Sequence, residues 1–477
     1  MNQSTNHSPK KHALKPCSKY LKLVFHTWEN SELKANTLYG LLDYRDKKIK
    51  QNEVVAKPIS QVFAQIGNDI KAFDTIPEAL DMKNLLIEQG DVGDVQFNFL
   101  FCILLRRNGL NIYSFNQLLV ILKYLDSIKS LQESHPELYK LFGECKDIEN
   151  LKEILELVEV ENSSKDLWRV TKSVNWNRSC RDDHIRSRGL KIKQGDIIKL
   201  GRLKMKLVDI QTTKDMLKSK NQCSKLDSFK SLEEEIIVER DHISLRIEDE
   251  QDTLIPCRFC LSSESKPHDP LMNLCNCKGT QGFLHTECLR SWMEAQMTHE
   301  ILNENSELYN WSSTSCELCK APYPTSIEFN GKTKSILNYE KPDEPYFVFE
   351  KFAPEVSSEI TKKSFYIFRI KNLQEYKIGK SSECEYILDD ASASRFHAVI
   401  AFEDPNCILL KDYKSRYGTQ QLMTIPQTLD NKDSANNVFQ IGRTWCKVEF
   451  KKKEAKSSIN SVSFGLFCGI FSRRKKH

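Results

Sequence analysis

The sequence predicts a multidomain α+β protein with three structured parts: a mixed helical and β N-terminal region, a small cysteine-rich module and a C-terminal β-sandwich. Three observations support this fold class. The 477 residues are enough for about two to four domains. Seven of the 16 cysteines fall between positions 257 and 319. After that cluster, short β-rich runs alternate with turn residues about every ten positions, which is typical of a sandwich.

Changes in composition divide the chain into segments. Two charged stretches with few aromatic residues separate the structured parts, and polar tails flank them. The predicted segments are a disordered tail (1–17), the N-terminal region (18–210), a linker (211–250), the cysteine-rich module (251–326), a second linker (327–350), the sandwich (351–455) and a C-terminal tail (456–477).

The N-terminal region carries signals of both kinds. SKYLKLVFHTW near its start looks like a strand, and LWRVTKSV and LKIKQGDIIKLGRLKMKLVDI near its end alternate in the manner of strands. Between them, FNFLFCILLRRNGLNIYSFNQLLVILKYLDSI has apolar residues at helical and nearly continuous spacing, so we predict buried helices there. ELYKLFGECKDIENLKEILELVEV is predicted to be a further amphipathic helix.

A short segment of this region resembles one near the C-terminus. GDIIKLGRLKMKLV aligns without a gap on NNVFQIGRTWCKVE, which places Gly201 and Arg202 on Gly442 and Arg443. The match is too short to prove a duplicated domain, and two unrelated hairpins would explain it equally well. The other interpretation is a degenerate copy of the C-terminal sandwich that is interrupted by the helical stretch and serves for packing or dimerisation.

Charge and targeting signals argue against several classes of function. The net charge of +5 is small for this length, and we expect no nucleic-acid binding. The N-terminus shows no signal peptide, and no run reaches the roughly 18 apolar residues of a membrane span. We therefore expect an intracellular protein, cytoplasmic or nuclear. In that reducing environment, clustered cysteines favour metal binding over disulfides.

The C-terminal tail holds one weak membrane signal. GLFCGIFSRRKKH joins a short apolar run and Cys468 to four cationic side chains, a combination that a palmitoyl anchor would use. Because so short an apolar run binds membranes only marginally, a last strand or a disordered tail is the preferred interpretation.

The cysteine cluster has the spacing of a module that binds two zinc ions. Its eight candidate ligands form four close pairs, and structural zinc takes four thiolate or imidazole ligands in a tetrahedron. The pairs could fill the two sites consecutively or alternately. Alternation would make a cross-brace that ties distant segments together and replaces a core that so small a module lacks. It would give one site to Cys257, Cys260, His285 and Cys288 and the other to Cys275, Cys277, Cys316 and Cys319.

One further histidine, His268, lies in the same stretch but has no such partner, so we interpret it as an ordinary loop residue. Metal binding would also change the charge. Seven thiolates and two zinc ions alter the net charge of +5 by −7 + 4 = −3, to +2. A nearly neutral protein again argues against nucleic-acid binding.

Seven cysteines with a histidine fifth in order resemble two families, RING-CH domains and PHD fingers. The single residue between Cys275 and Cys277, and Trp292 four positions after Cys288, are similar to RING-CH domains. A PHD finger, as in a chromatin reader, has a tryptophan where Thr314 stands, so that reading is disfavoured. The gap before the last ligand pair is longer than usual for RING-CH domains, and we expect an insertion there, NENSELYNWSSTS.

The resemblance to RING-CH domains implies a ubiquitin ligase of the RING type. Such domains perform no covalent chemistry; they hold a ubiquitin-conjugating enzyme charged with ubiquitin and favour transfer by positioning. No residue is therefore expected to be catalytic in the covalent sense. The matching contact residues are Phe259 inside the first ligand pair, Trp292, and Lys320 directly after the last ligand. Each also has a structural reading, as a core residue or a solvated charge.

The segment 363–452 resembles forkhead-associated (FHA) domains, which are β-sandwiches whose loops bind phosphothreonine peptides. The matching motifs are Gly379-Lys380, Ser394-Arg395-Phe396-His397 and Ser415-Arg416-Tyr417-Gly418-Thr419. The resemblance implies that Lys380 supplies positive charge and Ser394 a hydroxyl to the phosphate. It assigns further phosphate contacts to Arg395 and Arg416, and the shape of the loops to His397, Gly418 and Thr419.

Two positions depart from the FHA pattern. Lys380 stands in place of an arginine and loses the bidentate fork of a guanidinium. Tyr417 stands in place of the asparagine that normally grips the peptide backbone. Both departures predict weaker or altered phosphopeptide binding.

Together these features predict a zinc-dependent ubiquitin ligase whose partners are a ubiquitin-conjugating enzyme, ubiquitin and a phosphothreonine-containing protein. The alternative is a non-enzymatic, phospho-dependent adaptor in which the zinc module serves only for docking. Trp292 and Lys320 favour the ligase, because both match contact positions that an adaptor does not need.

Overall fold

The structure is a computed structural model, and it describes residues 19–28, 49–66, 69–88, 97–123, 128–143, 166–171, 189–211, 255–266, 268–329, 332–352, 362–371, 375–404, 407–432 and 437–452. Both predicted tails, nearly all of the first linker and Cys468 lie outside these residues. Within the described ranges, no helix has the length and apolar character that a membrane span requires.

Residues 346–422 fold as a β-sandwich together with three strands that precede the cysteine-rich module. One sheet of this C-terminal sandwich has the order β18–β17–β10–β9–β23, and the other has the order β20–β19–β21–β22–β8. Leu207, Phe349 and Ile400 are among the fully buried residues between the sheets. The strands are β8 (Leu190–Ile192), β9 (Ile197–Leu200), β10 (Leu203–Gln211), β17 (Tyr346–Lys351), β18 (Lys363–Arg369), β19 (Glu375–Gly379), β20 (Tyr386–Ile387), β21 (Ala398–Asp404), β22 (Cys407–Asp412) and β23 (Thr419–Leu422).

The C-terminal sandwich therefore extends beyond the predicted segment 351–455. β10 pairs antiparallel with β17, and β8 pairs antiparallel with β22, so the sandwich takes both sheets partly from residues 190–211. The physical reason is the open edge of each sheet, whose backbone donors and acceptors need a partner strand.

A second sandwich, the N-terminal sandwich, combines the start of the chain with its last described strands. Its sheets have the orders β2–β1–β26–β25–β7 and β24–β6–β5–β3–β4. Phe25, Phe63 and Phe101 meet in its core. The strands are β1 (Lys19–Trp28), β2 (Ile49–Ala56), β3 (Gln61–Ile66), β4 (Asp69–Phe73), β5 (Phe97–Arg106), β6 (Gly109–Tyr113), β7 (Leu167–Val170), β24 (Gln427–Thr428), β25 (Val438–Ile441) and β26 (Thr444–Lys452).

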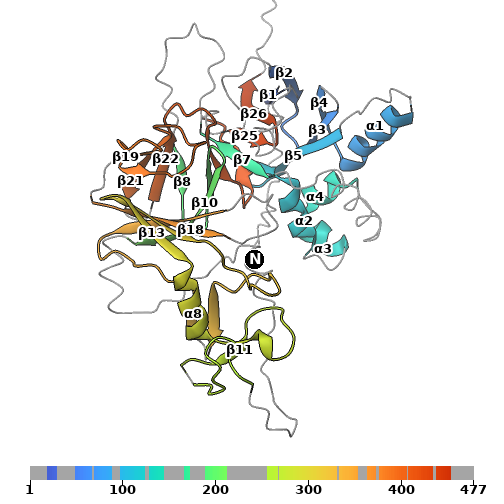
Figure 1. The fold of residues 1–477 in the computed structure, drawn as a ribbon. Coiled ribbons are helices and arrows are strands. Elements are labelled where there is room, and N and C mark those ends of the chain that lie inside the picture. The colour runs from blue at the N-terminus through green and yellow to red at the C-terminus, as the bar shows by residue number, and fades with distance from the viewer. Residues whose placement is uncertain are drawn as a thin grey trace, which may run out of the picture.

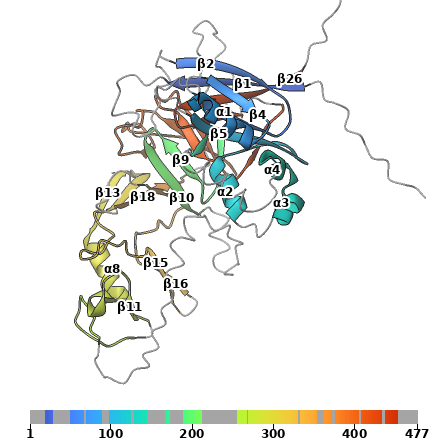
Figure 2. The same ribbon diagram turned by 90° about the vertical axis from the view of Figure 1, so that its right-hand side faces the viewer.

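The two sandwiches share one strand. β23 pairs with β9 of the C-terminal sandwich on one side and with β7 of the N-terminal sandwich on the other. One continuous sheet of 12 strands therefore runs through both sandwiches. Figure 2 shows β1, β2 and β26 side by side at the end of this arrangement that is farthest from the cysteine-rich module.

Among the described residues, four helices cover the outer face of the N-terminal sandwich. Val62 and Phe99 point toward the helices, whereas Phe63 and Phe101 point into the sandwich. Figure 1 shows this helical layer beside β3 and β5. The helices are α1 (Ile76–Glu88), α2 (Phe115–Lys123), α3 (Ile128–Ser134) and α4 (Pro136–Leu141).

The buried helices predicted across residues 97–128 are wrong for 97–113, where the structure places β5 and β6, and are confirmed by α2 for 115–123. β5 is buried on both faces, between the sandwich core and the helices, so its sequence is almost continuously apolar. A continuous apolar run does not distinguish a strand from a buried helix. The strand expected near residue 18 is confirmed by β1. The described chain is mostly β-strand, which does not support the predicted mixed helical N-terminal region.

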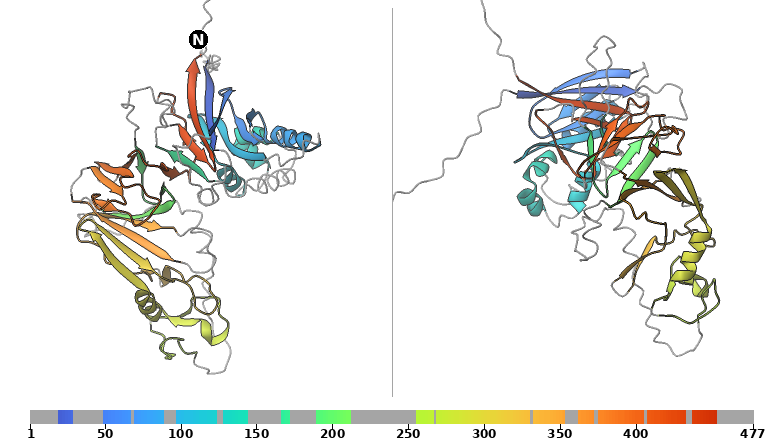
Figure 3. Two further views of the ribbon diagram at one scale, coloured as in Figure 1. Left: turned by 45° about the horizontal axis from the view of Figure 1, so that its top comes forward. Right: turned by 90° about the vertical axis from the view of Figure 1, so that its left-hand side faces the viewer.

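The cysteine-rich module projects from the C-terminal sandwich (Figures 1 and 3). Its helix α8 continues into a hairpin, β13–β14, whose second strand pairs with β18 of the sandwich. The expected insertion overlaps this hairpin. The elements are β11 (Leu271–Asn273), β12 (Phe283–His285), α8 (Thr286–Ala295), β13 (Met297–Asn303), β14 (Ser306–Trp311), β15 (Ser326–Phe329) and β16 (Lys332–Ser335).

Candidate zinc centres and phosphopeptide loops

Two ligand pairs of the cysteine-rich module form the same tight turn. The backbone N–H of Leu261 donates to the carbonyl of Cys257 at 2.9 Å, and the N–H of Lys320 donates to the carbonyl of Cys316 at 2.9 Å. Leu261 and Lys320 have positive φ angles of 63° and 61°. Each turn aims both sulfur atoms of its pair at one point, as a shared ion requires.

The start of helix α8 brings the pair His285 and Cys288 together. His285 occupies the position that caps the helix, and Cys288 lies in its first turn. Asp269 stabilises this start, because its Oδ1 accepts hydrogen bonds from the hydroxyl of Thr286 at 2.9 Å and from the N–H of Glu287 at 2.8 Å. A carboxylate there satisfies backbone donors that a helix start leaves free.

The structure assembles the eight candidate ligands in the alternating arrangement. The potential ligand atoms of each group lie within 4.8 Å of one another. The two groups are Cys257, Cys260, His285 and Cys288, and Cys275, Cys277, Cys316 and Cys319. Each group is a complete set of four sulfur or imidazole donors, which is consistent with two zinc ions.

The orientation of His285 fits a metal ligand. Its Nδ1 lies 3.2 Å from the Cys260 sulfur and 3.8 Å from the Cys288 sulfur. Its Nε2 donates to the carbonyl of Glu264 at 2.9 Å, which leaves Nδ1 without a proton and free to bind a cation. His268, in contrast, belongs to neither group.

Arg258 crosses between the two ligand groups. Its guanidinium donates to the Cys316 sulfur at 3.4 Å and to the Tyr323 hydroxyl at 2.8 Å. Burial acts to raise the pKa of the Cys316 thiol, but hydrogen bonds from Arg258 and from the backbone of Cys319 outweigh it and lower that pKa to about 5. The thiolate form that zinc binds is therefore favoured at neutral pH.

Two of the three proposed contact residues pack against each other. The rings of Phe259 and Trp292 stack with centroids 6.2 Å apart, and both side chains are partly exposed. Lys320 is exposed. Sequence reasoning missed two apolar residues of the ligand turns, Leu261 and Leu318, which are 75% and 59% exposed. The sequence signal that could have identified them is an apolar residue within or directly after a zinc-ligand pair. A small module has little core in which to bury such a residue.

The predicted phosphopeptide residues come from three loops that are tied together at Ser394. The carbonyl of Ser394 accepts from the N–H of Lys380 at 3.1 Å, and its hydroxyl accepts from the N–H of Arg416 at 3.0 Å. The side chains of Lys380, Arg395 and Arg416 are exposed. Arg416 lies over the ring of Tyr417, 5.1 Å from its centroid.

Buried residues hold these loops in shape. Nδ1 of His397 accepts from the N–H of Ser394 at 3.0 Å, and its Nε2 donates to the carbonyl of Gly418 at 3.0 Å. The hydroxyl of Thr419 donates to Asp412 at 2.8 Å. These contacts agree with the loop-shaping roles that the resemblance implied for His397, Gly418 and Thr419.

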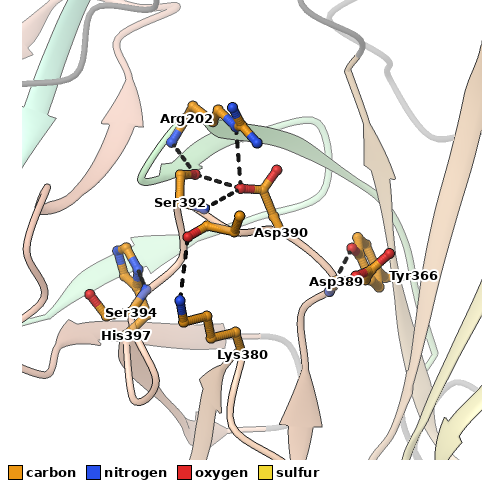
Figure 4. A network of polar contacts seen from close by, with 9 residues as sticks. Arg202, Tyr366, Lys380, Asp389, Asp390, Ser392, Ser394 and His397 are labelled. Atoms are coloured by element: carbon orange, nitrogen blue, oxygen red, sulfur yellow. Dashed lines mark hydrogen bonds and ion pairs between the residues drawn. The ribbon is translucent and has the colours of Figure 1, made fainter. Parts of the chain in front are cut away.

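The turn between β9 and β10 contacts the same loops, as Figure 4 shows. The N–H of Arg202 donates to the hydroxyl of Ser392 at 2.9 Å, and the Arg202 guanidinium lies 3.5 Å from a carboxylate oxygen of Asp390. Gly201 allows this approach, because a Cβ there would lie 2.7 Å from the Ser392 carbonyl oxygen. Sequence reasoning missed this contact, since the turn precedes Ser392 by almost 200 positions.

These features define a class of protein: a cross-braced zinc module of the RING type carried by a β-sandwich with a cationic loop face. Comparison with known proteins agrees. Residues 257–319 match the family model of the RING-variant domain, and residues 376–434 match that of the FHA domain.

The curated relatives match a short part of the chain. The E3 ubiquitin-protein ligase MARCHF7 of Rattus norvegicus is 28% identical over 89 residues, which cover 19% of this chain and 12% of the relative. The probable E3 ubiquitin-protein ligase MARCHF10 of Homo sapiens is 32% identical over 77 residues, which cover 16% of this chain and 9% of the relative. The chain thus spans about a tenth of the length of these relatives. No solved structure matches the chain.

Proposed function

We propose that this chain is a zinc-dependent ubiquitin ligase of the RING type that selects phosphorylated proteins through its C-terminal sandwich. The observation that carries the proposal is the stacked, partly exposed pair Phe259 and Trp292, on a module whose two ligand turns also expose Leu261, Leu318 and Lys320. Partly exposed aromatic and apolar residues on a rigid module make a docking surface. The relatives are named as ubiquitin ligases, which supports a ubiquitin-conjugating enzyme as the docked partner.

The two zinc ions have a structural role in this proposal, because each ligand group is complete and leaves no coordination position open. When bound, they supply much of the free energy that folds so small a module. Phe259 and Trp292 then hold the conjugating enzyme, and the exposed Lys320 contributes a positive charge to the contact. Transfer of ubiquitin is accelerated by this positioning alone.

The cationic loop face selects the protein to be modified. Lys380, Arg395 and Arg416 offer positive charge, and Ser394 offers a hydroxyl between them. A phosphothreonine dianion needs such charge and fixed donors. Tyr417 cannot supply the amide contact of an asparagine, so we expect modest affinity.

The test measures ubiquitin transfer by the full chain with a panel of ubiquitin-conjugating enzymes. Trp292→Ala is expected to lower transfer about ten-fold or more, while two zinc ions per chain remain bound. Lys278→Ala, on the exposed surface of the same module, is the matched control and should keep full transfer. Unchanged transfer by Trp292→Ala contradicts the proposed interface.

The adaptor alternative has a distinct outcome. Absence of transfer by the wild-type chain with every conjugating enzyme, together with retained phosphopeptide binding, would replace the ligase proposal by a phospho-dependent adaptor.

A further inference from the structure

The hairpin β13–β14, called the insertion hairpin below, joins the zinc module to the C-terminal sandwich without an intervening linker. Helix α8, which carries Trp292, ends at Ala295, and β13 begins two residues later at Met297. At the base of the hairpin, the backbone N–H of Ser312 donates to the carbonyl of Gln296 at 3.0 Å. Any movement of α8 is therefore passed on to the hairpin.

The far side of the insertion hairpin is fixed to the sandwich. β14 pairs antiparallel with β18 along its whole length. Glu307 of β14 is buried; it forms an ion pair with Arg369 of β18 and lies 3.0 Å from Nε2 of His299 in β13. One apolar cluster crosses the junction and includes Met293 of α8, Trp311 of β14, Val348 of β17 and Ile367 of β18.

The tip of the insertion hairpin contacts the loop that carries Lys380. The side-chain amide of Asn303 donates to the carbonyls of Cys384 and Glu385 at 3.1 and 3.2 Å. The hydroxyl of Ser306 donates to the carbonyl of Glu385 at 3.0 Å. Cys384 is hydrogen-bonded in turn, through its N–H, to the carbonyl of the residue after Lys380 at 3.1 Å.

We propose that the insertion hairpin is a positioning element that holds the phosphopeptide loops at a fixed separation from the conjugating-enzyme surface. This inference rests on the proposed function and specifies it further. A flexible tether would let ubiquitin reach lysines at many distances from the phosphothreonine. A rigid connection limits transfer to lysines at a narrow range of distances, since effective concentration falls steeply when a geometry cannot be reached.

The experiment uses the full chain and a set of peptides with one phosphothreonine and one lysine at increasing separation. We expect ubiquitin transfer to peak at a narrow range of separations, about ten-fold above transfer at other separations. The unphosphorylated peptides should show no such peak. A flat profile among phosphopeptides that bind overturns the inference.

A double variant tests the hairpin itself. Asn303→Ala with Ser306→Ala removes the side-chain hydrogen bonds from the tip to Cys384 and Glu385, and we expect a lower and broader peak with unchanged phosphopeptide affinity. Discharge of ubiquitin from the conjugating enzyme to free lysine should be unchanged. Glu300→Ala, exposed on β13 of the same hairpin, is the matched control and should keep the wild-type profile. An unaltered profile in the double variant overturns the inference.

Failure of the proposed ligase function would give a different experimental result. Loss of discharge to free lysine by the wild-type chain contradicts the ligase function itself. Discharge without transfer to any phosphopeptide overturns the positioning inference and leaves the ligase function standing.

A second inference comes from the strand order of the two sandwiches. The N-terminal order β2–β1–β26–β25–β7 has the C-terminal equivalent β18–β17–β10–β9–β23, and β4–β3–β5–β6–β24 has the equivalent β20–β19–β21–β22–β8. Along the chain, β1–β7 thus correspond to β17–β23, and β8–β10 correspond to β24–β26. One local difference is that β3 and β4 pair antiparallel, whereas β19 and β20 pair parallel.

The strand limits support the same equivalence. β9 and β25 span 197–200 and 438–441, and β10 and β26 span 203–211 and 444–452, so one constant offset relates all four limits. Gly201 and Gly442 between them both have positive φ angles, 69° and 50°.

We infer that the chain contains two copies of one sandwich that have exchanged their last three strands. Without exchange, β10 would pair with β1 and β26 would pair with β17. In the structure β10 pairs with β17, and β1 pairs with β26. Each copy completes the core of the other, so neither copy is closed by its own half of the chain.

Hydrogen exchange of the full chain tests the exchanged pairing with two equivalent core residues. Leu207 lies opposite Phe349 of β17, and Val448 lies opposite Leu23 of β1. Leu207→Ala should raise amide exchange first in β17, and Val448→Ala should raise it first in β1. The reverse pattern, with Leu207→Ala loosening β1, overturns the inference.

Discussion

The two sandwiches share a strand order but differ in the loops at one end. In the C-terminal sandwich, the connections after β19, β20 and β22 are short and present Lys380, Ser394 and Arg416. In the N-terminal sandwich, the connections after β4 and β6 contain α1 and α2–α4, which bury the outer face of β3 and β5. The strand order is therefore common to both sandwiches, and we expect a ligand to bind only at the loops of the C-terminal one.

The largest predicted effect comes from substitutions in the cores of the two sandwiches. Phe101→Ala in the N-terminal sandwich and Phe347→Ala in the C-terminal sandwich should each lower the free energy of unfolding by about 3–5 kcal/mol, because both rings are fully buried. With exchanged strands, denaturant titration should show one common transition for both sandwiches. Two separate transitions, with only one shifted by each variant, would contradict this.

A smaller effect compares the two equivalent turns. Gly201→Ala should cost about 2 kcal/mol or more, because a left-handed residue gains a Cβ that would also meet the Ser392 carbonyl at 2.7 Å. Gly442→Ala should cost about 1 kcal/mol from its backbone conformation. Calorimetry of both variants checks the order. We expect only Gly201→Ala to weaken phosphopeptide binding, since only this turn touches the loops.

The next prediction concerns the positive charge on the loops of the C-terminal sandwich. Lys380→Ala should weaken the best binder of a phosphothreonine peptide library by roughly ten- to a hundred-fold, as expected for a lost charged contact of about 1.5–3 kcal/mol. Lys411→Ala, on β22 and away from the loops, is the control and should bind normally. Equal loss in both variants would point to general attraction between charges rather than to a phosphate site.

A gain of function is expected to be smaller. Tyr417→Asn restores an amide where the FHA pattern has one, and a neutral hydrogen bond adds about 0.5–1.5 kcal/mol, or roughly two- to ten-fold in affinity. Isothermal titration with the same peptide measures the change. No tightening would show that the peptide backbone does not pass this position.

The smallest predicted effect is a pH dependence of stability in the N-terminal sandwich. Burial lowers the pKa of His26 on β1 below its ordinary value of 6.5. The unfolded state then binds more protons than the folded state, so the stability contributed by neutral His26 is complete above about pH 6.5 and falls as the pH decreases. Hydrogen exchange of β1 should therefore rise slightly between pH 7 and pH 5. His26→Gln should remove this dependence, and an unchanged slope in that variant would contradict the assignment.

The zinc module was the most predictable part of the molecule from sequence. The close spacing of the ligand pairs identifies them, because a tight turn must place both donors of a pair on one ion. The structure gathers these residues into two groups of four. The candidate phosphopeptide residues come from short loop motifs, and their role stays a prediction; the structure ties Lys380, Ser394 and Arg416 together. Exposed Leu261 and Leu318 were missed, because sequence pattern alone does not separate an apolar contact residue from a core residue.

The exchange of strands could not be predicted. β10 would show the same alternation of apolar residues whether it paired with β1 or with β17, since both neighbours offer an apolar face. The alignment of Gly201 with Gly442 signalled a repeat but not which half each strand completes. Similarly, β5 looked like a helix because the helical layer on its outer face removed the alternation.

The pairing of β1 with β26 has a consequence for synthesis on the ribosome. Thr27 and Thr444, whose hydroxyls lie 3.2 Å apart, are separated by 417 positions. At roughly 5–20 residues per second, β1 waits for its neighbour for a time on the order of tens of seconds. The first sandwich to be translated is thus among the last parts of the protein to close, and nascent chains of this protein should depend on chaperones until translation is nearly complete.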